Sequence, residues 1–371
     1  MPWTALNTAA YRLWYRARSR RGRGPLPVDA PPPERPRVLF LAWGRIGDTV
    51  LSTGILKHFR AAFDGCEIVC AGRPEVRAVV APHVDRYLPF DAVPRGPWAA
   101  VVTDVHFFYG GVHALGGLVE ALDAQRVLVY EGYHLGPGLA PSRPYPANAE
   151  VVSAAAGAVH VLDHGAHHLE ETLHRLGVDA EIADARPDLR VDAGAPSDVV
   201  AWQPASNNRK KDWPMERWRE VLAAFPDTRF VALGAAASRE AVEALGLAHV
   251  ENRCGATTLR EAMSVIAGAA GFLGPDSGLT HVAACLGRPT VCVGQNANLG
   301  TFFPYPDAYG FDNLRAVFHE DYRACAGCFM TCRHEPIALT WLKGAKCLRE
   351  LPAGPVIEAV RAHLPAAAAA P

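Results

Sequence analysis

One aspartate of the chain ends a glycine-bearing segment that a ligand could approach closely. It ends the segment Gly44-Arg-Ile-Gly-Asp48, which directly follows the apolar run Val38-Leu-Phe-Leu-Ala-Trp43. Gly44 and Gly47 permit a tight turn and a close approach of the backbone to a ligand. Asp48 would then lie at the mouth of a cleft, at the start of a helix. Its spacing alone favours a capping role, in which the carboxylate accepts hydrogen bonds from free backbone N–H groups.

A second segment carries groups that could bind phosphate. Gln203-Pro-Ala-Ser206 leaves an apolar run and continues through Asn207-Asn-Arg-Lys-Lys-Asp-Trp-Pro214. Ser206 supplies a hydroxyl. One of the three cations at 209–211, Lys211 among them, could neutralise a diphosphate, because charge-assisted hydrogen bonds to phosphate are strong. Taken singly, such a basic loop is more often solvated surface.

A third segment has the composition of an anion site at a helix start. Gly274-Pro-Asp-Ser-Gly-Leu-Thr-His281 follows an apolar run and precedes another. Asp276, Ser277 and Gly278 would open a helix whose free N–H groups and dipole favour a negative ligand. His281 falls one turn inside that helix. A lone histidine on a helix is usually structural, but this one directly follows the expected phosphate turn.

Four cysteines form the last constellation. They are spaced as Cys325-x2-Cys328-x3-Cys332-x14-Cys347. Four thiols could hold a structural zinc ion, although the spacing is irregular for a zinc ribbon. Reduced thiols in a tight loop, or a redox pair, explain the same spacing.

The elements that must position these residues alternate between short apolar runs and helical patterns. Such alternation predicts an α/β fold with a doubly wound, mostly parallel sheet, and its restart after a Pro/Gly-bearing stretch predicts a second sheet of the same kind. Open α/β sheets bind ligands outside the carboxyl ends of their strands. We expect strands at 38–43, 66–71, 99–104, 126–130, 198–203, 229–234, 271–274 and 290–294, and helices at 49–63, 216–224, 238–245, 259–269, 279–286 and 354–364.

The domain boundaries follow from this pattern. We expect a basic tail and Pro-rich linker at 1–36, a first Rossmann-like domain at 37–185 and a hinge at 186–197. A second Rossmann-like domain at 198–352 would contain the Cys-rich segment 325–347, and 353–371 would form a last helix and an Ala/Pro tail. The tail from Ala9 to Arg23 is rich in arginine and aromatic residues. It could touch anionic lipid headgroups or be a solvated segment without a role.

Composition limits the class of protein. The chain has 371 residues, 50% hydrophobic and 20% charged, and a net charge of −1, so we expect no nucleic-acid partner. Its nine cysteines are odd in number, and several lie in apolar runs, as buried free thiols do. No apolar run reaches the roughly 18 residues of a membrane span. These features predict a cytoplasmic protein.

Read together and in this order, the motifs resemble glycosyltransferase family 9, the heptosyltransferases of lipopolysaccharide core assembly. The resemblance spans about residues 37–364. It rests on the strand–Gly-x-x-Gly-Asp start, the Lys-x-Trp-Pro element, the Asp-Ser-Gly-x-x-His turn and the Cys-rich end. The matching stretches are Val38–Arg60, Asp198–Trp218, Gly255–Gly294 and Cys325–Glu350.

The resemblance implies a GT-B architecture of two facing Rossmann-like domains. The domain at 37–185 would bind the acceptor, and the domain at 198–352 would hold most of the nucleotide-sugar donor. It implies an inverting, metal-independent transfer from an ADP-heptose-type sugar nucleotide to a lipopolysaccharide-core or related envelope glycan, with no cofactor required. Asp48 matches the catalytic aspartate and becomes the expected general base. Lys211 matches the lysine beside the donor phosphates, and Asp276, Ser277, Gly278 and His281 match the donor-binding turn.

Some segments depart from the family pattern. Gly294-Gln-Asn-Ala-Asn298 replaces a Gly-Pro-Thr-x-Pro-like segment, and the loop at 235–238 lacks the acidic residue expected near a donor ribose, for which Glu240 could substitute. His106, His113 and His134 match no motif, and we expect them to be ordinary loop and core residues.

Two other functions compete with sugar transfer. A Rossmann-type dehydrogenase would need a third glycine after the first strand, which the chain lacks. A non-catalytic nucleotide-binding relative would not need Asp48.

Overall fold

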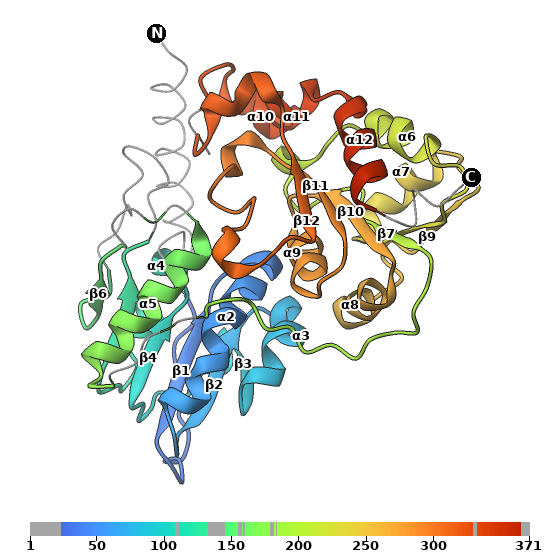
Figure 1. The fold of residues 1–371 in the computed structure, drawn as a ribbon. Helices are drawn as coiled ribbons and strands as arrows, with labels where there is room; N and C mark the ends of the chain where they lie inside the picture. The colour runs from blue at the N-terminus through green and yellow to red at the C-terminus, as the bar shows by residue number, and fades with distance from the viewer. Residues whose placement is uncertain are drawn as a thin grey trace. The chain divides into compact units, whose positions relative to one another are not determined.

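The computed structural model forms two compact units, one ending at Asp188 and the other beginning at Leu189. Each unit contains one six-stranded sheet in which every neighbouring pair of strands is parallel (Figure 1). The predicted α/β class, with two doubly wound sheets, is confirmed. The structure describes residues 24–107, 111–132, 145–154, 158, 160–178, 182, 184–328 and 332–364.

Four of the sequence expectations fall wholly or partly outside these ranges. The arginine-rich segment up to Arg23 and all of His134 are not among the described residues, and neither is the side chain of His113. The Ala/Pro tail after Leu364 lies outside them as well.

The N-terminal unit has the strand order β3-β2-β1-β4-β5-β6. The first strand therefore lies between β2 and β4, and the chain winds outward from it in both directions. Every residue of β1 is buried, and from Val38 to Ala42 the strand is continuously apolar, as expected of a strand covered on both faces. Helices α2 and α5 pack against each other (Figure 1). The elements are β1 (Arg37–Ala42), α2 (Ile46–Ala62), β2 (Glu67–Gly72), α3 (Arg77–Val80), β3 (Arg86–Pro89), β4 (Ala100–Thr103), α4 (Val112–Glu120), β5 (Val127–Tyr130), β6 (Glu150–Val152) and α5 (Val161–Arg175).

The C-terminal unit repeats this winding with the order β12-β11-β10-β7-β8-β9. Its first strand, β7, lies between β8 and β10. Helix α6 packs with α12, and α8 packs with α9 (Figure 1). The elements are β7 (Val200–Trp202), α6 (Met215–Ala223), β8 (Phe230–Ala232), α7 (Arg239–Glu243), β9 (Val250–Asn252), α8 (Leu259–Gly268), β10 (Gly271–Pro275), α9 (Gly278–Cys285), β11 (Thr290–Val293), β12 (Leu314–Val317), α10 (Ile337–Lys343), α11 (Lys346–Glu350) and α12 (Ala353–His363).

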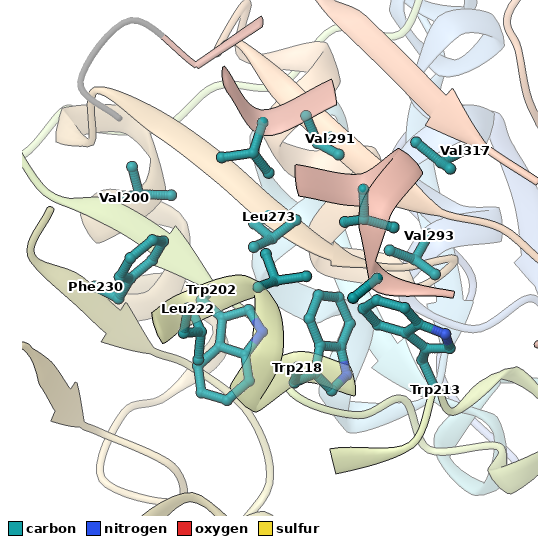
Figure 2. Close-up of a cluster of buried hydrophobic side chains, with 14 of the residues drawn as sticks. Val200, Trp202, Trp213, Trp218, Leu222, Phe230, Leu273, Val291, Val293 and Val317 are labelled. Carbon is teal, nitrogen blue, oxygen red and sulfur yellow. The ribbon is translucent and has the colours of Figure 1, made fainter. Parts of the chain in front are cut away.

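Three tryptophans dominate the core of the C-terminal unit. Figure 2 shows Trp202, Trp213 and Trp218 beside the valines and leucines of the central strands. The Trp213 and Trp218 rings meet edge to face with centroids 4.8 Å apart, and the Trp202 and Trp218 centroids are 5.9 Å apart. Such edge-to-face pairs add to the free energy gained from burying the rings. Trp213 is thus an anchor for the loop that precedes α6.

The predicted strands and helices are present, with ends displaced by a few residues. The expectation omitted β3, β6, β9 and β12, which are three or four residues long and lie at or next to the sheet edges. Their residues are partly exposed, so no continuous apolar run marks them. It also omitted the helices α3, α4, α10 and α11, and α5, in which polar residues and histidines interrupt the apolar positions.

No helix among the described residues is both long enough and apolar enough to cross a membrane.

Candidate active site

Asp48 lies in the first turn of α2, as its third residue. Its Oδ2 accepts a hydrogen bond from the backbone N–H of Arg45 at 2.9 Å. The carboxylate therefore satisfies one of the free N–H groups at the helix start, but from inside the helix and not from the N-cap position that the spacing suggested. Because 27% of the side chain remains exposed, Asp48 is also accessible to a ligand.

Gly44 allows the turn before α2 to close against this aspartate. A Cβ atom at Gly44 would come within 2.5 Å of the Cβ of Asp48, so a larger residue would push the carboxylate away. Gly47 lies further on, as the second residue of α2. Of the two glycines, Gly44 is therefore the one whose backbone lies close to the Asp48 side chain.

Two residues after β4 join Asp48. The parallel register pairs Leu41 with Thr103, so the chain leaves β1 and β4 at the same edge of the sheet. The carboxylate of Asp104 accepts the backbone N–H of Gly44 at 2.8 Å and that of His106 at 3.1 Å. The imidazole Nε2 of His106 lies 3.3 Å from Oδ1 of Asp48.

Sequence reasoning missed Asp104 and treated His106 as an ordinary residue. A usable signal existed, because residues 99–104 were predicted as a strand and Asp104 stands at its carboxyl end. The carboxyl ends of neighbouring parallel strands lie at the same edge of a sheet. In α/β folds, ligands bind at this edge, beside the strands from which the chain winds in opposite directions (the topological switch point). What the sequence did not indicate was that β4 would be the neighbour of β1.

Burial changes the acidity of Asp104. The side chain has no exposed surface, and this burial raises its pKa to about 6 against the opposing effects of His106 and the Gly44 N–H. The nearby Asp48 carboxylate also raises the pKa. A buried carboxylate is costly unless it is hydrogen-bonded, and Asp104 meets this need with backbone N–H groups.

The C-terminal unit brings Lys211 and Asp276 together in the same way. Strands β7 and β10 are neighbours, so the loops that follow them meet at one edge. Lys211 Nζ lies 2.9 Å from Oδ1 of Asp276, and Nδ2 of Asn298 donates to Oδ2 of the same carboxylate. Burial acts to raise the pKa of Asp276, but Lys211, His281 and Asn298 together lower it below the usual range.

Lys211 is fixed from its C-terminal side. Trp213, two residues further on, is only 2% exposed and donates its indole N–H to the Leu351 carbonyl at 3.1 Å. The tryptophan anchors the loop in the core, so the lysine leaves the loop at a defined place. Among the three cations at 209–211, Lys211 is the one that contacts Asp276. Burial, with the neighbouring charge of Lys211, lowers the pKa of Lys210 to about 8.

Ser277 and Gly278 open α9 directly after this ion pair. Ser277 is the N-cap residue, and its hydroxyl donates to Oε1 of Gln203 from the loop after β7. Gly278 is the first residue of the helix. Backbone N–H groups of a first helical turn have no partner within the helix and carry the positive end of its dipole, which suits a phosphate.

Ser206 closes the loop that carries Lys211. Its N–H and its hydroxyl both donate to Oδ1 of Asp212, at 2.8 Å and 3.1 Å. The predicted donor-binding hydroxyl therefore shapes the loop in this structure.

His281 is held in an aromatic stack. Its Nδ1 lies 2.6 Å from the Tyr305 hydroxyl, and its ring stacks on Phe303 with centroids 4.5 Å apart. The residue is 3% exposed. His281 therefore packs beside the turn at the start of α9. The sequence analysis did not predict a role for Tyr305 or Phe303.

The four C-terminal cysteines are free thiols. Within the described ranges, no group of three or more His, Cys, Asp and Glu side chains is placed to hold a metal ion. Burial raises the pKa of Cys325 and that of Cys347, the latter to about 11, so both thiols are protonated near neutral pH. Cys325 lies 3.2 Å from Nε2 of His334.

One family model and several solved structures are similar to this chain. Residues 161–312 match the family model described as glycosyltransferase family 9 (heptosyltransferase). No curated protein sequence matches the chain.

Three solved structures share the fold over nearly the whole length of both chains. The E. coli ADP-heptose lps heptosyltransferase II has a TM-score of 0.56 at 16% identity, covering 88% of this chain and 98% of its own. The E. coli heptosyltransferase WaaC with ADP has a TM-score of 0.58 at 18% identity, covering 90% and 99%. The family 9 glycosyltransferase of Veillonella parvula has a TM-score of 0.62 at 16% identity, covering 88% and 96%. The predicted GT-B type of architecture is thereby confirmed.

Proposed function

We propose that this chain is a glycosyltransferase that transfers a heptose from ADP-heptose, because residues 161–312 match the model of glycosyltransferase family 9 (heptosyltransferase) and the chain shares the fold of solved heptosyltransferases. The acceptor is a hydroxyl of a lipopolysaccharide-core or related envelope glycan. The transfer inverts the configuration at the anomeric carbon and requires no metal ion. The observation that carries the proposal is the pairing of Lys211 with Asp276 directly before the N-terminus of α9.

Asp48 acts as the general base. It accepts the proton of the acceptor hydroxyl, whose oxygen attacks the anomeric carbon on the face opposite to the departing diphosphate. Its exposed fraction of 27%, beside the closed turn at Gly44, supports this role. A base in such a position contributes about 10²–10⁴ to the rate.

Lys211 and the first turn of α9 receive the diphosphate. ADP gains negative charge as it leaves, and a fixed ammonium with nearby helix N–H groups stabilises that charge in the transition state. Asp276 acts through the lysine, because its carboxylate is 1% exposed and faces the ammonium. Lys211 uses one hydrogen of its ammonium on Asp276 and keeps the others for phosphate oxygens.

The proposed acceptor is a glycolipid, and the proposed location is the cytoplasm. A cytoplasmic enzyme would meet a glycolipid acceptor at the inner face of the membrane, where the arginine-rich segment before Arg23 could contact anionic headgroups.

Calorimetric titration tests the donor. Purified protein in EDTA is titrated with ADP, UDP, GDP and their sugar conjugates, and we expect ADP and ADP-heptose alone to bind. Lys211→Ala should weaken ADP binding, whereas Lys343→Ala, a change of an exposed lysine on α10, should not. Equal binding of all three diphosphates, or loss of binding in EDTA, would contradict the proposed donor or the metal independence.

Transfer itself is tested with ADP-heptose and a Kdo-bearing lipid A acceptor. We expect wild-type product of inverted anomeric configuration by NMR and a transfer rate lowered by about 10²–10⁴ for Asp48→Asn. Binding of ADP-heptose without transfer to any glycan hydroxyl would favour a non-catalytic relative.

A further inference from the structure

We infer that His106 is a positioning residue that holds the Asp48 carboxylate for proton transfer, and that Asp104 fixes His106 in turn. The inference rests on the proposed function of Asp48 as the base. It extends the site by two residues that come from another strand of the sheet.

The two oxygens of Asp48 face different partners. Oδ2 accepts the Arg45 N–H at 2.9 Å, and Oδ1 lies 3.3 Å from Nε2 of His106. A carboxylate contacted at one oxygen can still turn about its Cβ–Cγ bond. The imidazole lies within ion-pair distance of the other oxygen but without hydrogen-bond geometry. Its bulk and its dipole oppose that rotation and so limit the directions from which the base receives its proton.

His106 itself is fixed by Asp104. This carboxylate binds the backbone N–H of His106 and that of Gly44, and so joins the loop after β4 to the turn after β1. The distance between the imidazole and Asp48 therefore depends on one buried side chain. If Asp104 were absent, the two loops would be joined less firmly and Nε2 would no longer be held at Oδ1.

The surroundings of the imidazole limit its alternatives. A cavity of about 10 Å³ next to His106 is lined by Leu51, Ile55 and Leu162 and contains little room for another ring position. The His106 side chain is 7% exposed, against 27% for Asp48, so substrate would reach Asp48 rather than the histidine. This burial is why His106 acts through Asp48 and is not itself a catalytic residue.

The first experiment is a kinetic double-mutant cycle with ADP-heptose and a Kdo-bearing lipid A acceptor. We expect His106→Ala to lower kcat by about 10- to 100-fold, the size of effect that a misplaced group produces, with the KM for ADP-heptose changed less than twofold. In the Asp48→Asn background the same change should have no further effect, because its action passes through the missing carboxylate. His106→Gln, which keeps an N–H donor at similar reach, should recover most of the lost kcat. His167→Ala, a histidine of α5 whose ring contacts the Ser153 carbonyl, is the control and should leave kcat unchanged.

A second cycle uses urea unfolding and needs no substrate. The midpoint shift of the Asp48→Asn/His106→Ala protein should differ from the sum of the two single shifts, whereas independent residues give additive shifts.

The outcomes separate the inference from its premise. No turnover by the wild type, or full activity of Asp48→Asn, overturns the proposed function and the inference with it. A strongly impaired Asp48→Asn protein beside a fully active His106→Ala protein overturns the inference alone. Equal loss in the Gln and Ala variants, or additive effects in the kinetic cycle, also overturns it.

Discussion

Replacing Lys211 by methionine should destabilise the C-terminal unit as well as weaken ADP binding. The ammonium faces a carboxylate that is 1% exposed, so its removal leaves a buried charge without its cation. Breaking a buried ion pair in this way costs about 3–5 kcal/mol. Because 26% of the lysine side chain is exposed and Asn298 still donates to Asp276, we expect the lower end, about 3 kcal/mol. For a unit of this size the melting temperature should fall by about 6–12 °C.

The double variant Lys211→Met/Asp276→Asn separates the two effects. With both charges removed, no buried carboxylate is left unpaired, and most of the lost stability should return. ADP binding should stay weak, because the cation that receives the diphosphate is still missing. Calorimetric melting and ADP titration of the wild type and both variants measure the two quantities, with Lys343→Met as the exposed-lysine control.

The pH dependence gives an independent check on the same pair. In the wild type the pKa of Asp276 is lowered, so its stabilising effect is present above the unfolded-state value of about 3.9 and is lost as the pH falls through the folded-state value. Without Lys211, burial is no longer outweighed and should raise the pKa of this carboxyl. The stability difference between Lys211→Met and the wild type should therefore shrink as the pH is lowered from about 7 toward 4. Equal melting temperatures of Lys211→Met and the wild type at pH 7 would refute the reasoning. A stability difference between the two proteins that does not change with pH would refute it as well.

Three further predictions concern other residues. Asp48→Asn keeps an oxygen that can accept the Arg45 N–H, so thermal unfolding should be nearly unchanged while the transfer rate falls by about 10²–10⁴; a fast variant would remove the carboxylate from the chemistry. Trp213→Ala removes a buried ring from the core and should lower the free energy of unfolding by about 3–5 kcal/mol in a urea titration, and a cost below about 1 kcal/mol would contradict the anchoring role. The pKa of Asp104 is raised to about 6, so the folded protein binds its proton more tightly than the unfolded chain, and this residue should make stability rise as the pH falls from about 6 to 4. In Asp104→Asn that contribution should be absent when urea midpoints are compared across this range, and identical pH profiles would exclude it.

Local sequence predicted much of the fold because buried parallel strands are continuous apolar runs. The run at 38–43 is β1, and the turn that follows it leads into α2 as expected. The short, partly exposed strands β3, β6, β9 and β12 carry no such run. Their place in the sheets comes from pairing with a buried neighbour.

The candidate site residues of the two units show the same difference between local and distant sequence. Asp48, Lys211 and the Asp276 turn were predicted from motifs that are contiguous in the chain. Asp104, His106 and Asn298 were not, because each becomes part of a site only through a partner far away in the sequence. The Asp104–Gly44 hydrogen bond spans 60 residues, and the Lys211–Asp276 pair spans 65.

The sequence by itself determined the alternation of strands and helices, the glycine-bearing turn and the basic loop, because these depend on residues close together in the chain. Tertiary structure decided which strands became neighbours. By setting β4 beside β1 and β10 beside β7, it brought the carboxyl ends of distant strands to one edge in each sheet. It also decided which groups are buried, and burial is what raises the pKa of Asp104 and makes the charge of Asp276 depend on Lys211. A carboxylate has the same chemistry everywhere in the sequence, and only its surroundings in the fold set its proton affinity and its partners.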